Sequence, residues 1–303
     1  MSFVLAALDG GPPDGLMQVM KLLIFGLGYT GRAIARAALA AGYAVTATTR
    51  GNAAPESGVE PGVELIPFGR AAQAIAGATH LIATAAPDEH GDPVLARHRS
   101  AIEAGAELQW LGYLSTTGVY GDAGGAWVDE FSPPHPGSER TRRRVAAEAA
   151  WQGLPFPLAL FRLAGIYGPG RSMLDDLRAG QGRHVVKPGH LFGRIHRDDI
   201  AAGVLAAMRQ EASGIFNFAD DEPAAPADVL AEAARLLGVE PPPPVPFEEA
   251  ARSMSPMARS FWAENRKVRA ERTKQRLGIA WRYPTYREGL RAILAEEAER
   301  GSA

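Results

Sequence analysis

Glycines near the start of the chain have the spacing of a phosphate-binding loop. The segment KLLIFGLGYTGRAIARAAL (21–39) has the pattern of a buried strand, a Gly-x-Gly-x-x-Gly turn and a helix. In such a turn the first glycine permits the bend, the second lets backbone amides approach a pyrophosphate, and the third lets helix and strand pack closely. The anion then lies at the helix N-terminus, where N–H groups and the helix dipole favour it. We therefore expect a dinucleotide to contact Gly26, Gly28, Tyr29, Thr30 and Gly31.

The end of the next predicted strand indicates which dinucleotide binds. A site that prefers NAD usually carries Asp or Glu about 20 residues after the loop, where the carboxylate binds the ribose hydroxyls. Here the strand ends in Thr-Thr-Arg-Gly-Asn (48–52), which offers no carboxylate to repel a 2′-phosphate. We expect NADP, bound by Thr49 and Arg50, with NAD as the second candidate. The alternative for Arg50 is a solvated loop charge.

Strands and helices alternate around these residues. Most of the strand-length apolar runs are continuous, as in a parallel sheet covered on both faces, and the segments between them have helical spacing. We predict strands over 21–26, 44–49, 63–67, 80–84, 109–115, 157–163 and 214–218, and helices over 31–41, 70–76, 93–104, 139–152, 198–209 and 226–237. This alternation predicts an α/β fold, a doubly wound parallel sheet of Rossmann type with a smaller C-terminal α/β cap.

The expected domain organisation follows from this pattern. We predict a disordered leader or mis-assigned start over 1–19 (with Met17 or Met20 as the true start), an NADP-binding domain over 20–166 and 195–220, a substrate cap over 167–194 and 221–295, and a tail over 296–303. Within the cap, EPPPPVPF (240–247) has the composition of a stiff polyproline spacer.

Composition narrows the class of partner. The 303 residues include no cysteine, which excludes disulfides and thiolate metal sites and favours a reducing cytoplasm. The net charge of −2 gives no bulk attraction to nucleic acid or to an anionic membrane, and no apolar run approaches the length of a membrane span. The basic segment 262–276 is interleaved with Glu264 and Glu271, which favours a solvated helix face or a segment that closes the cap. We expect a small-molecule substrate, with no nucleic acid, membrane or metal ion as partner.

Six further segments, in order along the chain, resemble the extended short-chain dehydrogenase/reductase family, the NAD-dependent epimerase/dehydratases. They are HLIATAAP (80–87), YLSTTGVYG (113–121), VDEFSPPHP (128–136), FRLAGIYGPGR (161–171), RIHRDDIA (194–201) and GIFNFADDEP (214–223). The resemblance covers about residues 20–295, and within the family the chain is most similar to the atypical bacterial YeeZ-like subgroup. It implies that the loop with Ala85 and Ala86 lies over the cofactor, and that Thr116 corresponds to the family's catalytic Ser/Thr.

The resemblance breaks at the family's catalytic helix. The family pattern there is Tyr-x-x-x-Lys, usually with Glu four residues after the Lys. Aligning Glu148 with that Glu puts Arg144 at the Lys position and Arg140 at the Tyr position. Arginine stays protonated in proteins, so it cannot act as the proton donor. Arg140 and Arg144 could instead hold a ribose, a phosphate or a developing oxyanion, or form a solvated face of a helix capped by Ser138.

Other polar residues are candidates for the site, and most of them have both a functional and a structural interpretation. Thr116 could bind a substrate oxygen or be a satisfied strand-end hydroxyl, and Tyr120 could be a substitute proton donor or a packed aromatic. Arg171 is expected to bind an anionic group of the substrate. His196 could contact the substrate or hold the turn before a helix that has Asp198 as its N-cap.

Two classes of function stay open. The first is an NAD(P)-dependent oxidoreductase, epimerase or dehydratase that acts on a small polar or nucleotide-sugar-like substrate, with Arg140 and Arg144 in place of Tyr and Lys. The second is a non-catalytic NADP-binding sensor. The family resemblance also implies a homodimer through the helices over 93–104 and 139–152, although the arginines nearby weaken that expectation.

Overall fold

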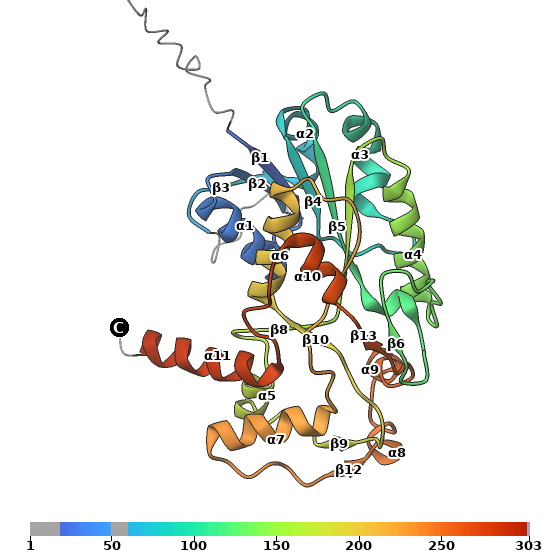
Figure 1. Cartoon of the computed structure of the whole chain (residues 1–303), viewed down its shortest axis with the longest axis vertical. Coiled ribbons are helices and arrows are strands. Elements are labelled where there is room, and N and C mark those ends of the chain that lie inside the picture. Colours follow the sequence, from blue (N-terminus) through green and yellow to red (C-terminus); the bar gives the residue numbers. More distant parts are fainter. Residues whose placement is uncertain (1–18, 50–59, 302–303) are drawn as a thin grey trace, which may run out of the picture.

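The computed structural model describes residues 19–49 and 60–301 (Figure 1). The predictions for the leader and for Arg50 therefore lie outside the described residues.

A parallel sheet of seven strands forms the centre of the molecule (Figure 1). Its order is β11-β7-β5-β4-β1-β2-β3, so the chain winds outward from β1 in both directions. The strands are β1 (Lys21–Phe25), β2 (Ala44–Thr49), β3 (Val63–Pro67), β4 (His80–Ala83), β5 (Trp110–Thr116), β7 (Leu158–Leu163) and β11 (Gly214–Phe218). The predicted doubly wound α/β fold is confirmed, and the reversal between β1 and β4 opens a crevice at the carboxyl ends of these strands.

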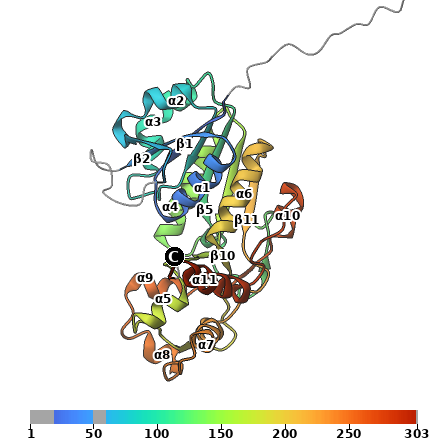
Figure 2. The same cartoon turned by 90° about the vertical axis from the view of Figure 1, so that its left-hand side faces the viewer.

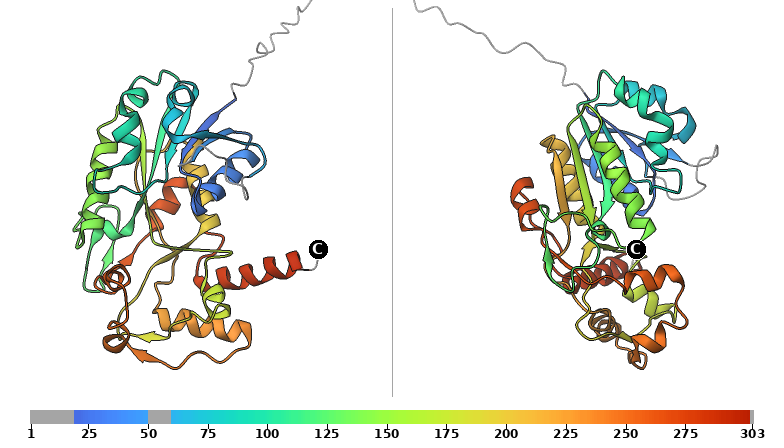
Figure 3. Two further views of the ribbon diagram at one scale, coloured as in Figure 1. Left: turned by 180° about the vertical axis from the view of Figure 1, so that it is seen from behind. Right: turned by 90° about the vertical axis from the view of Figure 1, so that its right-hand side faces the viewer.

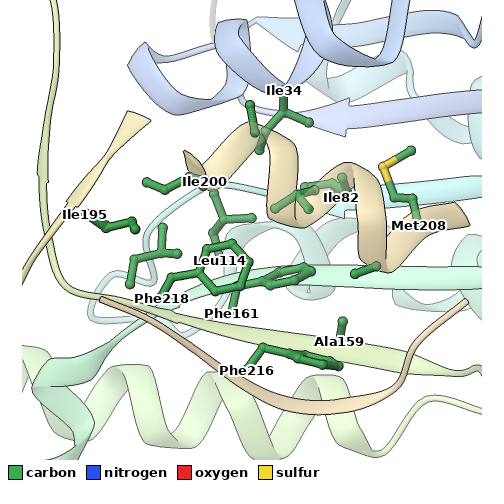
Figure 4. Close-up of a cluster of buried hydrophobic side chains, with 14 of the residues drawn as sticks. Ile34, Ile82, Leu114, Ala159, Phe161, Ile195, Ile200, Met208, Phe216 and Phe218 are labelled. Atoms are coloured by element: carbon green, nitrogen blue, oxygen red, sulfur yellow. The ribbon is translucent and has the colours of Figure 1, made fainter. Parts of the chain in front are cut away.

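Helices cover both faces of the sheet (Figure 2). One face carries α1 (Tyr29–Ala40) and α6 (Arg197–Arg209), and the other carries α2 (Ala72–Gly77), α3 (Pro93–Glu103) and α4 (Glu139–Gln152). On the first face Ile34 of α1 and Ile200 of α6 belong to one buried cluster with Phe161 of the sheet (Figure 4). The core therefore fixes α1, which follows the glycine loop, against the strand that precedes that loop.

Two local predictions are corrected at helix starts. The helix predicted over 70–76 is divided into a 3-10 turn, Phe68–Arg70, and α2. The N-cap of α6 is His196, not Asp198, because His196 Nδ1 accepts a hydrogen bond of 3.2 Å from the Asp198 N–H. Asp198 instead lies in the first turn, where its charge favours the helix dipole. Ser138 caps α4 as predicted.

The segments below the sheet in Figure 1 (residues 165–194 and 224–262) are here termed the cap. They contain β8 (Gly165–Tyr167), α5 (Met173–Arg178), β9 (Val185–Val186), α7 (Pro226–Leu237), β12 (Val245–Pro246), α8 (Phe247–Ala250) and α9 (Pro256–Phe261), while β10 (Arg194–His196) joins the cap to the sheet domain. The proline-rich segment is not only a spacer, because β12 within it pairs with β9.

The last part of the chain returns from the cap to the sheet. β13 (Lys267–Val268) pairs with β6 (Trp127–Val128), and α10 (Glu271–Leu277) contacts β11 and α6. α11 (Tyr286–Gly301) then extends to one side of the molecule (Figure 3), so most of the segment expected to be a tail is helical. No helix of the described residues is long and apolar enough to cross a bilayer.

Candidate functional site

The outer glycines of the loop are required by the fold itself. Gly26 has a φ of +101°, and a Cβ there would come within 2.6 Å of Thr84 Oγ1. A Cβ on Gly31 would come within 2.4 Å of the carbonyl oxygen of Gly26. The loop after β4 is also close, since that Cβ on Gly26 would lie 3.6 Å from the N atom of Ala85. These contacts lock the turn against β4 and place it beside the expected cofactor residues Ala85 and Ala86.

Gly28 is different, because the fold leaves space around it. Its φ is −80°, and a Cβ there would meet nothing within 4 Å. Gly28 is the N-cap of α1, whose first turn contains no acidic residue, and the first N–H groups of a helix have no partner within it. An open, exposed glycine at a helix N-terminus fits a pyrophosphate, because it lets the ligand approach the free backbone N–H groups closely.

A cavity of about 620 Å³ lies between the carboxyl ends of β5 and β7 and the cap. Thr116 and Arg140 line it from the sheet domain, and Tyr167, Phe192 and Trp262 line it from the cap side. The glycine loop is not part of this lining. The structure thus separates the dinucleotide loop from a second hollow, which has the size of a small-molecule pocket.

Two of the predicted catalytic residues meet in this cavity. Thr116 Oγ1 accepts a hydrogen bond of 3.1 Å from the Gly118 N–H, so its hydroxyl proton is left to donate. The guanidinium carbon of Arg140 lies 4.8 Å from the centre of the Phe261 ring. Partial burial, and then the positive charge of Arg144, lower the pKa of Arg140. An anion bound beside Arg140 would favour its protonated form and so oppose both effects.

Arg144 does not line the cavity. Its Nη1 donates to the hydroxyl of Tyr113 at 2.9 Å and to the carbonyl oxygen of Leu114 at 3.0 Å. The two arginines that replace the family's Tyr and Lys therefore differ in position, because Arg144 is engaged with the sheet and Arg140 faces the cavity.

Tyr120 does not line the cavity, and the geometry corrects its interpretation as a substitute proton donor. Its ring is 3% exposed, and its hydroxyl donates to Asn217 Oδ1 at 2.7 Å. Burial raises the pKa of Tyr120, and the guanidinium of Arg162 lies 4.7 Å from the centre of its ring. Of the two interpretations of Tyr120, a packed aromatic and a proton donor, the packed aromatic fits the structure.

His196 is likewise buried rather than presented to a substrate. It is 1% exposed, caps α6, and contacts the rings of Tyr167 and Tyr283. Burial lowers its pKa to about 4, so the imidazole is neutral at pH 7. The turn interpretation of His196 therefore fits the structure, and a substrate contact does not.

Arg171 lies at the glycine loop, not in the cavity where a substrate anion was expected. Its guanidinium carbon is 5.7 Å from the centre of the Tyr29 ring, and that of Arg197 is 5.0 Å from the same ring. The Tyr29 hydroxyl donates to the carbonyl oxygen of Pro169 at 3.1 Å. The loop after β8 and the start of α6 thus each place one cation beside the first residue of α1.

Asp88, Glu89 and Asp92 follow β4, and two of them have structural partners. Asp92 caps α3 through the N–H groups of Val94 and Leu95, and Asp88 accepts from the N–H of His90. Among the residues that the structure describes, no group of three or more His, Asp and Glu side chains is arranged to hold a metal ion.

Sequence reasoning missed the cavity residues that come from the end of the cap. Phe261, Trp262, Glu264 and Arg266 line the cavity, and Arg266 Nη1 donates to Glu264 Oε2 at 2.8 Å. The only signal in the sequence was an aromatic, basic segment, and nothing local indicates that it lies against α4.

A buried ion pair holds α4 on the sheet. Arg162 of β7 donates to Glu148 of α4 through Nη2 at 2.7 Å and through Nε at 3.2 Å, and both side chains are almost fully buried. Ser115, the residue before Thr116, also donates to Glu148. The helix that carries Arg140 and the strand that carries Thr116 are therefore joined at one carboxylate.

No protein-family model matches this chain. The chain is 31% identical over 180 residues to a 3-diazoavenalumate denitrifying reductase of a Streptomyces species, covering 54% of the chain and 58% of that protein. It is 33% identical over 134 residues to Protein YeeZ of Escherichia coli, covering 43% of the chain and 47% of YeeZ. The chain thus matches only about half the length of these curated relatives.

Solved structures match over nearly the whole chain. A functionally unknown conserved protein from Silicibacter pomeroyi is 44% identical, with a TM-score of 0.84, over 92% of this chain and 99% of that one. A putative NAD-dependent epimerase/dehydratase from Methylobacillus flagellatus is 26% identical, with a TM-score of 0.71, over 92% and 99% of the two chains. The fold and these likenesses define an NAD(P)-binding Rossmann protein, and they support an atypical protein of the extended short-chain dehydrogenase/reductase type. Among the curated relatives, the likeness to YeeZ agrees with this assignment over about half of that protein's length.

Proposed function

We propose that this protein is an NADP(H)-dependent oxidoreductase that reduces a small polar substrate, with Arg140 in place of the family's tyrosine. The observation that carries the proposal is that Thr116 and Arg140 line one cavity, while Arg144 and Tyr120 are engaged elsewhere. Two likenesses support it: the curated relative from Streptomyces is a reductase, and a human epimerase family protein with the same fold, 20% identical and with a TM-score of 0.71, was solved with NADPH.

The residues suggest how reduction proceeds without a tyrosine. A bound NADPH supplies a hydride, that is, two electrons and one proton, to the substrate and becomes NADP⁺. Thr116 donates a hydrogen bond to the substrate atom that gains the electron pair, and Arg140 stabilises negative charge on the substrate. Arg140 remains protonated throughout, so the second proton comes from water. The nucleotide-sugar-like substrates that the resemblance implies would use the same two residues.

A non-catalytic NADP sensor is the second candidate, and it is favoured by the engagement of Arg144 with Tyr113 and Leu114. A screen of aldehydes, ketones and nucleotide sugars with saturating NADPH separates the two functions. NADPH oxidation supports the reductase, whereas tight NADPH binding without oxidation on a broad panel supports the sensor. The homodimer through α3 and α4 stays a prediction.

Replacing Gly28 by valine is expected to weaken NADPH binding by about 10- to 100-fold, because crowding a close contact costs about 1–3 kcal/mol. The melting temperature should fall only slightly, since a Cβ at this position meets nothing within 4 Å of the protein and valine is only a weaker N-cap than glycine. Gly77→Ala is the control, because Gly77 is equally open but lies at the end of α2. Fluorescence titration with NADPH measures the effect, and equal affinity of the valine variant and the wild type would contradict a pyrophosphate at Gly28.

Arg171→Met is expected to weaken NADPH binding by about 10-fold, the equivalent of one hydrogen bond to a charged group. The reason is the position of Arg171 beside Tyr29 at the N-terminus of α1, where we place the cofactor phosphates. Arg178→Met is the matched control, since Arg178 pairs with Glu297 instead. Titrations at rising salt should reduce the difference between wild type and Arg171→Met. If the substitution raised only the KM for the substrate and left NADPH binding unchanged, Arg171 would bind the substrate and not the cofactor.

A further inference from the structure

The charges of the cavity limit what its ligand can be. Three arginines line it, namely Arg140, Arg194 and Arg266. Arg266 is already matched, because its Nη1 donates to the carbonyl oxygen of Gly121 and to Glu264 Oε2, each at 2.8 Å. Its side chain is 17% exposed, so this pair is held inside the wall of the cavity. Arg266 and Glu264 together contribute no net charge to a ligand.

Arg194 lines the cavity, but its guanidinium is bonded to the backbone. Its Nη1 donates to the carbonyl oxygens of Phe192 at 2.9 Å and Ala224 at 3.1 Å. Its guanidinium carbon lies 6.0 Å from the ring of Tyr286, which is fully buried in the cluster between α7 and α11. Burial lowers the pKa of Arg194, and the buried carboxyl group of Asp220 partly opposes this effect. The guanidinium of Arg194 is therefore bound mainly to groups of the protein and is less available to a ligand than that of Arg140.

Arg140 is the remaining cation. It is exposed, rests on the Phe261 ring, and makes no hydrogen bond or ion pair with any residue in the ranges 19–49 and 60–301. Its hydrogen-bonding groups are therefore available to one anionic group of a ligand. The other carboxylate in the lining, Asp176 of α5, is exposed, and it would repel a second negative charge.

The walls of the cavity favour a flat, apolar body. Trp262 packs against Phe192 with the ring planes nearly perpendicular and the centres 5.3 Å apart, and it stacks on His190 at 5.4 Å. These contacts fix the indole in one orientation, and Tyr167 and Phe261 add two further rings to the lining. Aromatic walls with one placed charge are typical of sites for small planar ligands.

We infer that the substrate is a planar monocarboxylate, an aromatic or conjugated acid, whose carboxylate pairs with Arg140 and whose body packs against Trp262 and Phe192. This inference rests on the proposed function, and it names the substrate class of the same cavity. A nucleoside diphosphate sugar fits less well, since its two phosphate charges would meet one available cation and the carboxylate of Asp176.

Ligand binding tests the inference without turnover. Calorimetric titrations with cinnamate, methyl cinnamate and UDP-glucose are made on the full chain, with and without saturating NADP⁺. Cinnamate is expected to bind about 10- to 100-fold more tightly than its uncharged ester. This ratio is the gain in affinity expected from one hydrogen bond between charged groups. Arg140→Gln should remove this preference and leave the affinity for the ester unchanged. Arg143→Gln is the matched control, because Arg143 lies on the same helix, pairs with Glu139 and does not line the cavity.

The outcomes separate this inference from the proposed function. Tighter binding of UDP-glucose than of cinnamate, or an acid preference that survives in Arg140→Gln, overturns the substrate class and leaves the NADP-dependent reductase standing. Binding of cinnamate through Arg140 by a protein that does not bind NADP⁺ supports the substrate class and overturns the proposed function. Quenching of tryptophan fluorescence by cinnamate, lost in Trp262→Phe, would place the acid in this cavity and not elsewhere.

Discussion

Replacing Arg140 by methionine is expected to lower kcat/KM for NADPH-dependent reduction by about 100- to 1,000-fold, the usual cost of removing one group that stabilises charge in the transition state. Methionine keeps much of the apolar stem of Arg140 and its packing on Phe261 but removes the charge. NADPH affinity should change little, because the glycine loop, where we place the pyrophosphate, is not part of the cavity that Arg140 lines. Steady-state kinetics and an NADPH titration on the same preparation measure both quantities.

Two further variants show whether Arg140 acts through its charge. Arg140→Lys should keep part of the activity, since lysine retains the charge without the planar hydrogen-bonding fork. Arg143→Met should behave as wild type. Full activity in Arg140→Met would remove Arg140 from the mechanism and leave Thr116 as the polar group that acts on the substrate.

Replacing Glu148 by alanine is expected to lower the free energy of unfolding by about 3–5 kcal/mol, the usual cost of removing one partner of a buried ion pair. The cause is the guanidinium of Arg162, which would stay buried with neither of its two hydrogen bonds to Glu148. Urea denaturation measures the change. Glu103→Ala, in an exposed pair with Arg99 on α3, should cost less than about 1 kcal/mol.

The same pair can be removed as a whole. Glu148→Leu combined with Arg162→Met should recover most of the stability, because no buried charge is then left without a partner. Activity should stay low in the double variant, since Ser115 loses its acceptor and α4 loses its tie to β7. A single variant as stable as wild type would show that this pair does not fasten α4 to the sheet.

Local patterns explain why much of the fold was predictable. Each central strand begins and ends within one residue of its predicted bounds, because continuous apolar runs between turn signals are read from neighbouring residues alone. The glycine loop was predictable for the same reason, since its glycines, strand and helix lie within one short segment. Asp198 was misplaced as an N-cap because the imidazole of His196 satisfies the same N–H.

The candidate site was less predictable because it depends on contacts between distant segments. The hydroxyl of Tyr120 is bonded to Asn217, and Arg140 lies over Phe261, more than 90 positions away in each case. No local pattern indicates either contact. The resemblance placed Arg140 and Arg144 together as a replaced pair, and only the packing on Tyr113 and Phe261 shows that they differ.

The central claim is that this chain reduces a substrate with NADPH although the family's tyrosine is absent. The most direct test mixes the protein with NADPH and a panel of small aldehydes, ketones, conjugated acids and nucleotide sugars, and follows the loss of NADPH absorbance. We expect oxidation of NADPH by wild type and by Arg143→Met, and almost none by Arg140→Met. Tight NADPH binding with no oxidation on any member of the panel, or equal oxidation by all three proteins, would contradict it.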